Sequence, residues 1–313
     1  MKKLLLSLFV MAMCAVQMRA QETPPAAETE MSEEELTLIL QQYSDSVEGT
    51  FKYQTGQISL NGIANLNVPA GWKYLDGPQA ERVLTEIWGN PPSPSLGMLI
   101  QENTGVLSPN AFAYNIEWEE IGYVEDDDAQ DTDYAELLKQ MQVDAIEERK
   151  AREAQGFVGY DVMDWASTPY YDSNKKVLHW AKELRFDGED ENTINYNIRV
   201  LGRKGVMVLN AIGTKSQLEQ IKSSVDPVLG SVAFTEGNRY EDFDDNVDEV
   251  AAYTIGGLVA GKVLAKVGFF AVIAKFGKFI LIGLAAAGAG IWRFIKGRRK
   301  DEDQFPQIEQ NNS

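Results

Sequence analysis

Polar residues on neighbouring predicted strands have the types and spacing of a binding surface. A two-residue turn at residues 203–204 places Asn197 opposite Asn210 and Arg199 opposite Val208, because a tight hairpin turn fixes the register of its two strands. The strand at residues 177–186 is expected to extend this surface. The predicted polar face then carries Glu183, Arg185, Asn195, Asn197, Arg199 and Asn210.

The place of Glu183 depends on the six-residue turn at residues 187–192. If that turn keeps the same alternation of faces, Glu183 falls beside Asn197. An arginine beside a carboxylate and amides can hold a polar ligand through charge-assisted hydrogen bonds. Paired charges on a sheet face are more often structural, and that alternative stays open. The candidate ligand-binding residues are Glu183, Arg185, Asn197, Arg199 and Asn210.

The residue types give little support to catalysis. His179 is the only histidine, and no Gly-x-Ser-x-Gly nucleophile motif accompanies it. A hydrolase would have to use carboxylates as its acid and base, drawn from Glu117, Glu119 or Glu183. No residue is predicted to be catalytic.

The acidic runs do not have the spacing of a calcium loop. Counted from Asp126, position 6 is Asp131 where an EF-hand needs glycine, and position 12 is Leu137 where it needs glutamate. The run at Asp242 has Val247 at position 6 and fails in the same way. A single histidine also excludes a zinc site built on a histidine pair. We therefore expect no metal and no cofactor, and a net charge of −18 disfavours nucleic acid as a partner.

Hydrophobic periodicity predicts an α+β fold, a mainly antiparallel sheet covered by helices. Asn61-Gly62 between two apolar runs is a strong hairpin signal, and Ser32 with Glu35 forms a capping box at the start of a helix. Further helices are predicted at residues 78–88, 132–153 and 216–229. The apolar stripe of the long helix is Tyr134, Leu137, Leu138, Met141, Ala145 and Ile146. Strands are predicted at residues 57–60, 63–68, 96–101, 112–118, 157–165, 177–186, 193–201, 206–212 and 231–234.

The N-terminus has the layout of a secretory signal. Lys2 and Lys3 precede an apolar run, and small residues lead to Ala20, so residues 1–20 are expected to be a signal peptide. The only cysteine, Cys14, lies within it. After cleavage no thiol would remain for disulfides or catalysis. Residues 21–50 are expected to form a linker and an amphipathic helix, and residues 51–245 the exported α+β domain.

The C-terminal region is apolar and basic. Residues 251–300 contain nine Lys or Arg and no Asp or Glu. We expect a glycine-rich juxtamembrane helix at 246–275, a transmembrane helix at 276–296 and a cytoplasmic tail at 297–313, because the positive-inside rule places the basic cluster in the cytoplasm. A hairpin of two spans, 251–274 and 276–295, is the alternative. Gly257 and Gly261 have the small-xxx-small spacing of helix–helix association.

Several segments together resemble a bacterial family of predicted membrane-anchored proteins, known as domain of unknown function 2167. The resemblance runs from about Tyr53 to Ile295 and implies placement in the envelope, with no activity or catalytic residue attached. The order of the strands is also similar to that of the Mog1/PsbP-like sandwiches, which concerns the fold only. The family segments are residues 53–56, 88–94, 122–124, 180–184, 195–203 and 239–243.

These observations favour a membrane-anchored envelope protein in the inner membrane, with an acidic domain on the periplasmic side. We expect a non-enzymatic role in binding or assembly, with a protein partner in the envelope. The alternative is a carboxylate-based periplasmic hydrolase acting on an envelope component.

Overall fold

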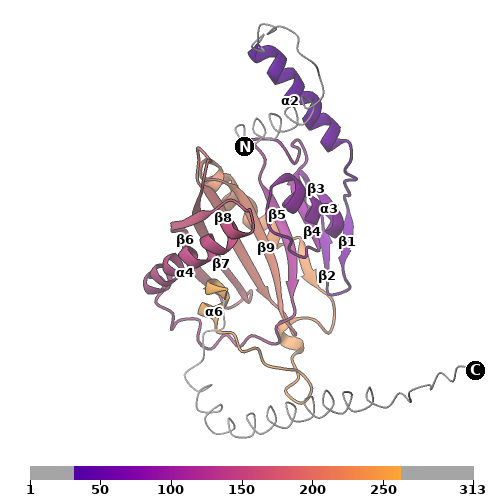
Figure 1. Ribbon diagram of the computed structural model, residues 1–313. Helices are drawn as coiled ribbons and strands as arrows, with labels where there is room; N and C mark the ends of the chain where they lie inside the picture. Colours follow the sequence, from indigo (N-terminus) through magenta and orange to yellow (C-terminus); the bar gives the residue numbers. More distant parts are fainter. Residues whose placement is uncertain (1–31, 262–313) are drawn as a thin grey trace, which may run out of the picture. The chain divides into compact units, whose positions relative to one another are not determined.

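The structure, a computed structural model, describes residues 32–261. Its centre is a seven-stranded sheet in which all neighbours are antiparallel (Figure 1). The α+β class with a mainly antiparallel sheet is therefore confirmed. In spatial order the strands are β3 (Trp72–Asp76), β4 (Gly97–Gln101), β5 (Ala113–Glu119), β9 (Val206–Thr214), β8 (Thr193–Leu201), β7 (Val177–Phe186) and β6 (Tyr160–Asp172).

A second, three-stranded sheet has β2 at its centre and consists of β1 (Gln57–Leu60), β2 (Ala64–Asn67) and β10 (Val232–Phe234). The predicted hairpin joins β1 to β2. Asn61 and Gly62 both have positive φ, 52° and 73°, as a type I′ turn requires. Three residues, 61–63, lie between the paired Leu60 and Ala64, so the hairpin is confirmed but its register differs by one residue from that of the predicted two-residue turn.

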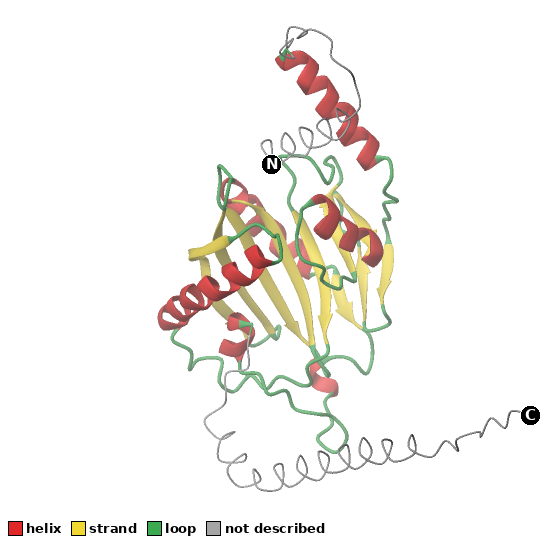
Figure 2. Cartoon of the chain, viewed as in Figure 1, coloured by secondary structure: helices red, strands yellow, loops and turns green. Residues whose placement is uncertain are grey.

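The helices cover both faces of the large sheet (Figure 2). The predicted capping box of Ser32 and Glu35 starts α2, which has no buried residue. The long helix α4 begins at Asp133, whose side chain accepts hydrogen bonds from two backbone N–H groups of the first turn. The helical elements are α2 (Glu33–Glu48), α3 (Gly77–Arg82), η1 (Val83–Ile87), α4 (Tyr134–Ala154), η2 (Lys215–Gln217), α5 (Leu218–Leu229), η3 (Tyr240–Asp242) and α6 (Ile255–Ala260).

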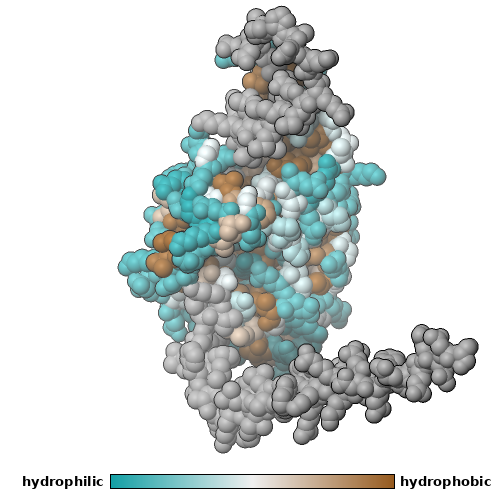
Figure 3. All heavy atoms as spheres, in the orientation of Figure 1, coloured by the Kyte–Doolittle hydropathy of each residue, from teal (hydrophilic) through white to brown (hydrophobic). Residues whose placement is uncertain are grey.

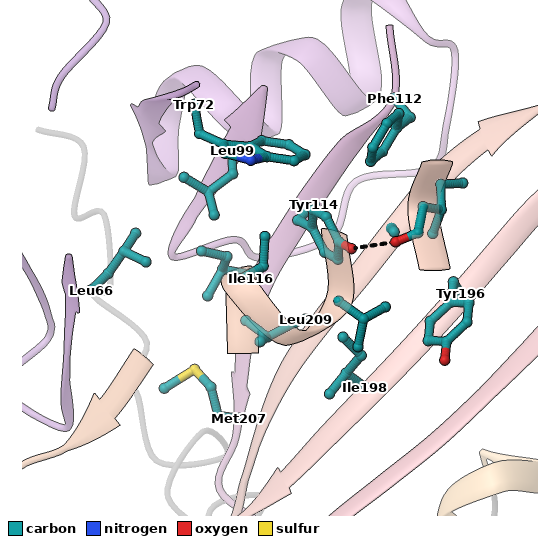
Figure 4. Close-up of a cluster of buried hydrophobic side chains, with 14 of the residues drawn as sticks. Leu66, Trp72, Leu99, Phe112, Tyr114, Ile116, Tyr196, Ile198, Met207 and Leu209 are labelled. Carbon is teal, nitrogen blue, oxygen red and sulfur yellow. Dashed lines mark hydrogen bonds between the residues drawn. The ribbon is translucent and has the colours of Figure 1, made fainter. Parts of the chain in front are cut away.

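One face of the large sheet, which we call the apolar face, packs against α5 and the small sheet. Leu209, Ile198 and Tyr114 lie in this core with Ile221 of α5 (Figure 4). The Tyr114 hydroxyl points toward α5, where it donates to the carbonyl oxygen of Ile221 and lies 2.7 Å from the Ser224 hydroxyl. The predicted alternation on β8 and β9 is confirmed, since three apolar pairs across these strands join this core: Tyr196 with Ala211, Ile198 with Leu209, and Val200 with Met207.

The opposite face carries α3 and η1 at one end and α4 at the other (Figure 1). Leu137, Met141 and Ala145 of α4 are buried. The predicted stripe is wrong at Ile146, which is 54% exposed on a helix whose outer side is mostly hydrophilic (Figure 3). A single helix crossing a twisted sheet buries a narrower stripe than the sequence period suggests. The strands β5, β9 and β8 lie in the middle of this face, between the strands that α3 contacts and the strand that α4 contacts.

The fold continues past the predicted domain boundary at residue 245. Asp248 forms an ion pair with Arg203 at 2.6 Å, and Tyr123 exchanges backbone hydrogen bonds with Glu249 and Ala251. Gly122 permits this approach, because a Cβ there would lie 2.9 Å from the Glu249 carbonyl oxygen. The prediction that the domain ends at 245 is wrong. Charged and backbone contacts hold this segment on the body, together with the buried side chains of Ala251, Ile255, Leu258 and Val259.

The expected long juxtamembrane helix is also corrected within the described residues. Of residues 246–261, only Ile255–Ala260 is helical, and this short α6 packs against α4. Gly257 is buried inside the chain, and Gly261 ends α6 with a φ of 69°. The two glycines therefore do not lie on one continuous helical face here.

No helix within residues 32–261 is long and apolar enough to cross a membrane. Several predicted segments lie outside the described residues: the signal peptide at 1–20, the start of the linker, residues 262–275, the transmembrane helix at 276–296 and the tail at 297–313.

Candidate functional site: a buried polar row

Four polar side chains lie side by side across four neighbouring strands. Asn115 of β5 is opposite Asn210 of β9, Asn210 is opposite Asn197 of β8, and Asn197 is opposite Trp180 of β7. Because side chains alternate along a strand, all four belong to the face opposite the apolar core. We call Asn115, Asn210, Asn197 and Trp180 the polar row.

Four charged residues lie on the same face beside the polar row. On β5, Glu117 and Glu119 follow Asn115 at intervals of two residues. Arg199 follows Asn197 on β8, and Lys182 pairs with Asn195. We call Glu117, Glu119, Lys182 and Arg199 the flanking charges.

Three of the five predicted site residues, Asn197, Arg199 and Asn210, share one sheet face, and the other two do not. Asn197 opposite Asn210 and Arg199 opposite Val208 are confirmed. Glu183 pairs with Ile194 instead of lying beside Asn197, because the β7–β8 connection has the opposite parity to the one predicted. Glu183 and Arg185 therefore belong to the other face. There Glu183 accepts hydrogen bonds from Asn192 and Lys215, and Arg185 pairs with Asp161.

Part of the polar row is held by hydrogen bonds. The Ser95 hydroxyl donates to Asn115 Oδ1 at 2.6 Å, and Asn115 Nδ2 donates to Glu117 Oε1 at 2.5 Å. Asn197 Nδ2 donates to the side-chain and backbone oxygens of Asn195. These contacts explain how Asn115 and Asn197, only 2% and 6% exposed, are accommodated next to an apolar interior.

Three other polar atoms of the site are buried without a hydrogen-bond partner among the described residues. They are Trp180 Nε1, Arg199 Nε and Asn210 Oδ1. Most buried polar atoms in folded proteins are paired, so three such atoms on adjacent strands are unusual. The Arg199 side chain is held through a different nitrogen, Nη1, which donates to Glu119 Oε1 at 2.8 Å. Its Cζ lies 5.6 Å from the centre of the Trp180 ring.

Burial shifts two of the flanking charges toward their neutral forms. It raises the pKa of Glu117, an effect that Arg199 opposes and Glu119 reinforces. It lowers the pKa of Lys182, against the attraction of Glu148 on α4. Both shifts have the sign that a charge withdrawn from water produces. Glu117, Glu119 and Lys182 are nevertheless partly exposed, so solvent reaches this edge of the site.

The chemistry available here is hydrogen bonding and charge pairing. Unpartnered donors on Trp180 and Arg199 share a sheet face with an unpartnered acceptor on Asn210. The carboxylates of Glu117 and Glu119 each already accept a hydrogen bond. His179 lies on the apolar side of β7 opposite Ile198 and contributes nothing to the row. Within residues 32–261, no group of three His, Cys, Asp or Glu is placed to hold a metal ion.

Two surface hollows occur elsewhere on the body. One of about 450 Å³ lies between the first helical turns after Pro78 and the proline-rich loop at Pro92. The other, of about 500 Å³, lies between β1 and the end of β3 near Asp76. Neither is lined by the polar row or its flanking charges.

The comparisons with known proteins bear on the family. Residues 52–288 match the family model described as protein of unknown function, DUF2167. The chain belongs to this family. The match includes the strands that carry the polar row and all four flanking charges.

No curated protein matches the chain. Among solved structures it is similar to cyanobacterial PsbP (CyanoP) from Synechocystis sp. PCC 6803, at 10% identity over 59% of this chain and 92% of that one, with a TM-score of 0.32. It is also similar to LpqN of Mycobacterium tuberculosis, described as involved in cell envelope biogenesis, at 11% identity over 61% and 96% of the two chains, with a TM-score of 0.30. Likenesses this distant carry no argument about function.

Proposed function

We propose that this chain is a non-enzymatic binding protein of the bacterial envelope, which takes a small polar ligand onto the polar row. One observation carries the proposal: Trp180 Nε1, Arg199 Nε and Asn210 Oδ1 are buried, unpartnered and grouped on one sheet face. An unsatisfied buried polar atom costs roughly 1–3 kcal/mol. Hydrogen bonds from a ligand would offset this cost for all three atoms.

Binding fits the site better than catalysis does. A general acid or base needs a free proton-transfer path to substrate. Here Oε1 of Glu117 already accepts a hydrogen bond from Asn115, and Oε1 of Glu119 accepts one from Arg199. One observation favours the alternative of a carboxylate-based hydrolase, namely the raised pKa of Glu117. A protonated carboxyl can act as a general acid, so turnover of a bound ligand by the wild type and its loss in Glu117→Gln would establish that alternative.

The placement in the envelope is part of the proposal and is supported by the sequence. The signal-like N-terminus and the basic, apolar C-terminus agree on a periplasmic body with an inner-membrane anchor. The segment before that C-terminus is fixed to the body through Asp248, Val250 and α6. Such an attachment would keep the body close to the membrane surface, where an envelope protein partner could reach it.

Ligand binding is tested by what the protein carries when purified. The full chain is isolated in mild detergent, denatured, and its released small molecules are identified by mass spectrometry. The wild type should release a polar compound that Arg199→Met lacks. The matched control Arg185→Met, on the other face, should retain it. Equal content in all three proteins would overturn the proposal.

Topology is tested separately with single cysteines. A cysteine replacing Val143, which is 59% exposed on α4, should react with a membrane-impermeant thiol reagent in intact spheroplasts. A cysteine replacing Asn312 should not react. Reaction at both positions would replace the single span with the hairpin of two spans.

A further inference from the structure

The strand β1 of the small sheet has one edge that pairs with no strand of the described residues. The order of that sheet is β1-β2-β10, so β1 meets β2 on one side only (Figure 1). Two hydrogen bonds show which way the backbone groups of β2 point. Val68 N–H donates to the Gly56 carbonyl oxygen next to β1, whereas Asn67 N–H donates to the Ser231 carbonyl oxygen next to β10.

Backbone groups alternate between the two edges of an antiparallel strand. Ile58 and Leu60 therefore bond to β2, and the N–H and C=O groups of Gln57 and Ser59 point away from it. No described residue forms a hydrogen bond with these four groups. Such a row of unpaired groups is a template for another strand. Although β1 is short, it carries none of the charges or prolines that block pairing at many natural edges.

The hollow of about 500 Å³ near Asp76 lies beside this edge. Gln57 and Ser59 line one side of it, and Tyr74 and Asp76 of β3 line the other. Gln54 also lines the hollow and joins the two sides, because its backbone exchanges hydrogen bonds with Tyr74. None of the lining residues belongs to β2, as expected for a hollow on the unpaired side of β1. Unpaired backbone groups and open space thus occur at the same residues.

The hollow has a single charged residue, Asp76, and no Lys, Arg or His lines it. Oδ1 of Asp76 accepts hydrogen bonds from the backbone and side-chain nitrogens of Gln79, but no described residue forms an ion pair with this carboxylate. The polar side chains of Gln54, Gln57 and Asn61 are uncharged. A cationic side chain is therefore the complement of this hollow, because it forms a charge-assisted hydrogen bond with a carboxylate.

We propose that β1 and this hollow bind an extended basic segment of a protein partner, which adds a strand to the small sheet. Backbone hydrogen bonds to Gln57 and Ser59 hold the segment, and a Lys or Arg side chain meets Asp76. In strand addition the main-chain bonds give affinity and the side chains give specificity. At about 3.3 Å per residue, a segment of roughly four to six residues covers β1. This surface is separate from the polar row and does not depend on a ligand there.

The first test uses the wild-type full chain in mild detergent and the probe acetyl-Val-Lys-Val-Lys-Val-amide. Calorimetric titration should show that this peptide binds at least tenfold more tightly than the same peptide with every backbone nitrogen methylated, which has no N–H to donate. Equal binding would mean that the acidic body attracts the probe by charge alone, and would overturn strand addition. Absence of binding by the parent peptide would overturn it as well.

Two variants of Ser59 separate the backbone from the side chain. Ser59→Ala and Ser59→Pro both remove the hydroxyl that accepts from Gly62 N–H, but only proline also removes the outward N–H. Proline is tolerated at an edge whose N–H meets solvent, and thermal unfolding of each variant shows that it is folded. Ser59→Pro should weaken the probe at least tenfold, and Ser59→Ala less than twofold. Equal affinities of the two variants would overturn pairing through β1.

The charge is tested at Asp76. Asp76→Asn keeps the acceptor for Gln79 and removes the charge, so it should weaken the probe about threefold, as for a partly exposed ion pair. The matched control Glu86→Gln, an acid that lines the other hollow, should bind as the wild type. Equal losses in both variants would show attraction to the acidic body as a whole and would overturn the assignment to Asp76.

A second copy of the chain is the other occupant that a free edge can take. Sedimentation should show no self-association of the wild type through this edge. A dimer that Ser59→Pro dissociates and Ser59→Ala retains would assign the edge to a second copy and overturn the basic partner.

The variant Arg199→Met, beside the polar row, should bind the peptide probe as the wild type does, and Ser59→Pro should retain the compound released from purified protein. The strand addition and the ligand site proposed above therefore fail separately. Loss of probe binding in Arg199→Met with unchanged binding in Ser59→Pro would overturn the assignment of the probe to β1.

Discussion

At β5, β9 and β8 the two faces of the seven-stranded sheet carry residues of opposite kinds, although both are largely withdrawn from water. At β3 and β4 both faces are apolar. On β9, Leu209 faces a continuous apolar core, and the next residue, Asn210, faces the polar row. On β5 the same contrast separates Tyr114 from Asn115. On the apolar face Tyr114 has hydrogen-bond partners on α5, although His179 Nδ1 has none among the described residues. The polar row and Arg199 together contain three buried atoms of this kind.

This difference distinguishes the residues that stabilise the fold from those that are candidates for binding. Apolar burial contributes roughly 25 cal/mol per Å² removed from water, so the apolar face and the apolar cluster beneath α3 stabilise the sheet strongly. Burying the amides and charges of the polar row costs free energy unless each group regains a hydrogen bond or an ion pair. Buried polar atoms that lack a partner yet lie together on one sheet face, as Trp180 Nε1, Arg199 Nε and Asn210 Oδ1 do, are better explained by binding than by folding.

The largest expected effect comes from truncating the apolar face. Leu209→Ala should lower the free energy of unfolding by about 2–5 kcal/mol, because it removes a fully buried side chain from the core and leaves a cavity. Urea unfolding followed by tryptophan fluorescence measures the change. A cost below that of Asn197→Ala would contradict the division of roles between the faces.

A smaller loss is expected from the hydrogen-bonded part of the polar row. Asn197→Ala removes the donor that serves both oxygens of Asn195, and orphaning these groups should cost about 1–3 kcal/mol. The same unfolding experiment measures it. A negligible cost would mean that water replaces Asn197 freely and that this part of the row is open to solvent.

The sequence predicted the strand pairing across a short turn, but not the pairing that depends on longer loops or on strands far apart in the chain. The two-residue turn after Gly202 gave the right register between β8 and β9, hence the pairing of Asn197 with Asn210. Glu183 was misplaced because a longer loop does not fix parity. The place of Asn115 depends on β5 meeting β9, strands about 90 residues apart in the chain.

Other differences have the same origin. Strand β3 was not predicted, because its five residues lie between a proline-containing turn and a helix start and show no clear alternation. Trp180 and Lys182 were missed as site residues since they follow from the corrected parity of β7. Glu117 and Glu119 were considered as catalytic acids, and only the strand order places them beside Arg199.

A third prediction compares a partnered with an unpartnered polar group. Tyr114→Phe deletes a hydroxyl that hydrogen-bonds to Ser224 and Ile221, and should cost about 0.5–1.5 kcal/mol. In protein freed of ligand, Asn210→Leu removes an acceptor that has no partner among the described residues. It should change the free energy of unfolding by less than about 0.5 kcal/mol or raise it. An equal cost for both would show that Asn210 is fully hydrogen-bonded in solution.

The smallest effect, and the sharpest in sign, comes from two glutamates on opposite faces. Burial raises the pKa of Glu117. Its protonation therefore favours the folded state below the ordinary glutamate pKa, and this contribution is lost as the pH rises through the folded value. Near neutral pH, Glu117→Gln should raise the melting temperature, because glutamine keeps the acceptor for Asn115 without a buried charge.

Glu183 should behave in the opposite way. Lys215 and Asn192 lower its pKa, so its ionised form adds stability above the ordinary glutamate pKa, and that contribution is lost as the pH falls through the folded value. Near neutral pH, Glu183→Gln should lower the free energy of unfolding by about 1 kcal/mol or less, as for a partly exposed ion pair. Melting curves of both variants across acidic and neutral pH measure the two signs. The same sign for both would mean that the carboxylates have similar surroundings, and the contrast between the faces would not extend to their charges.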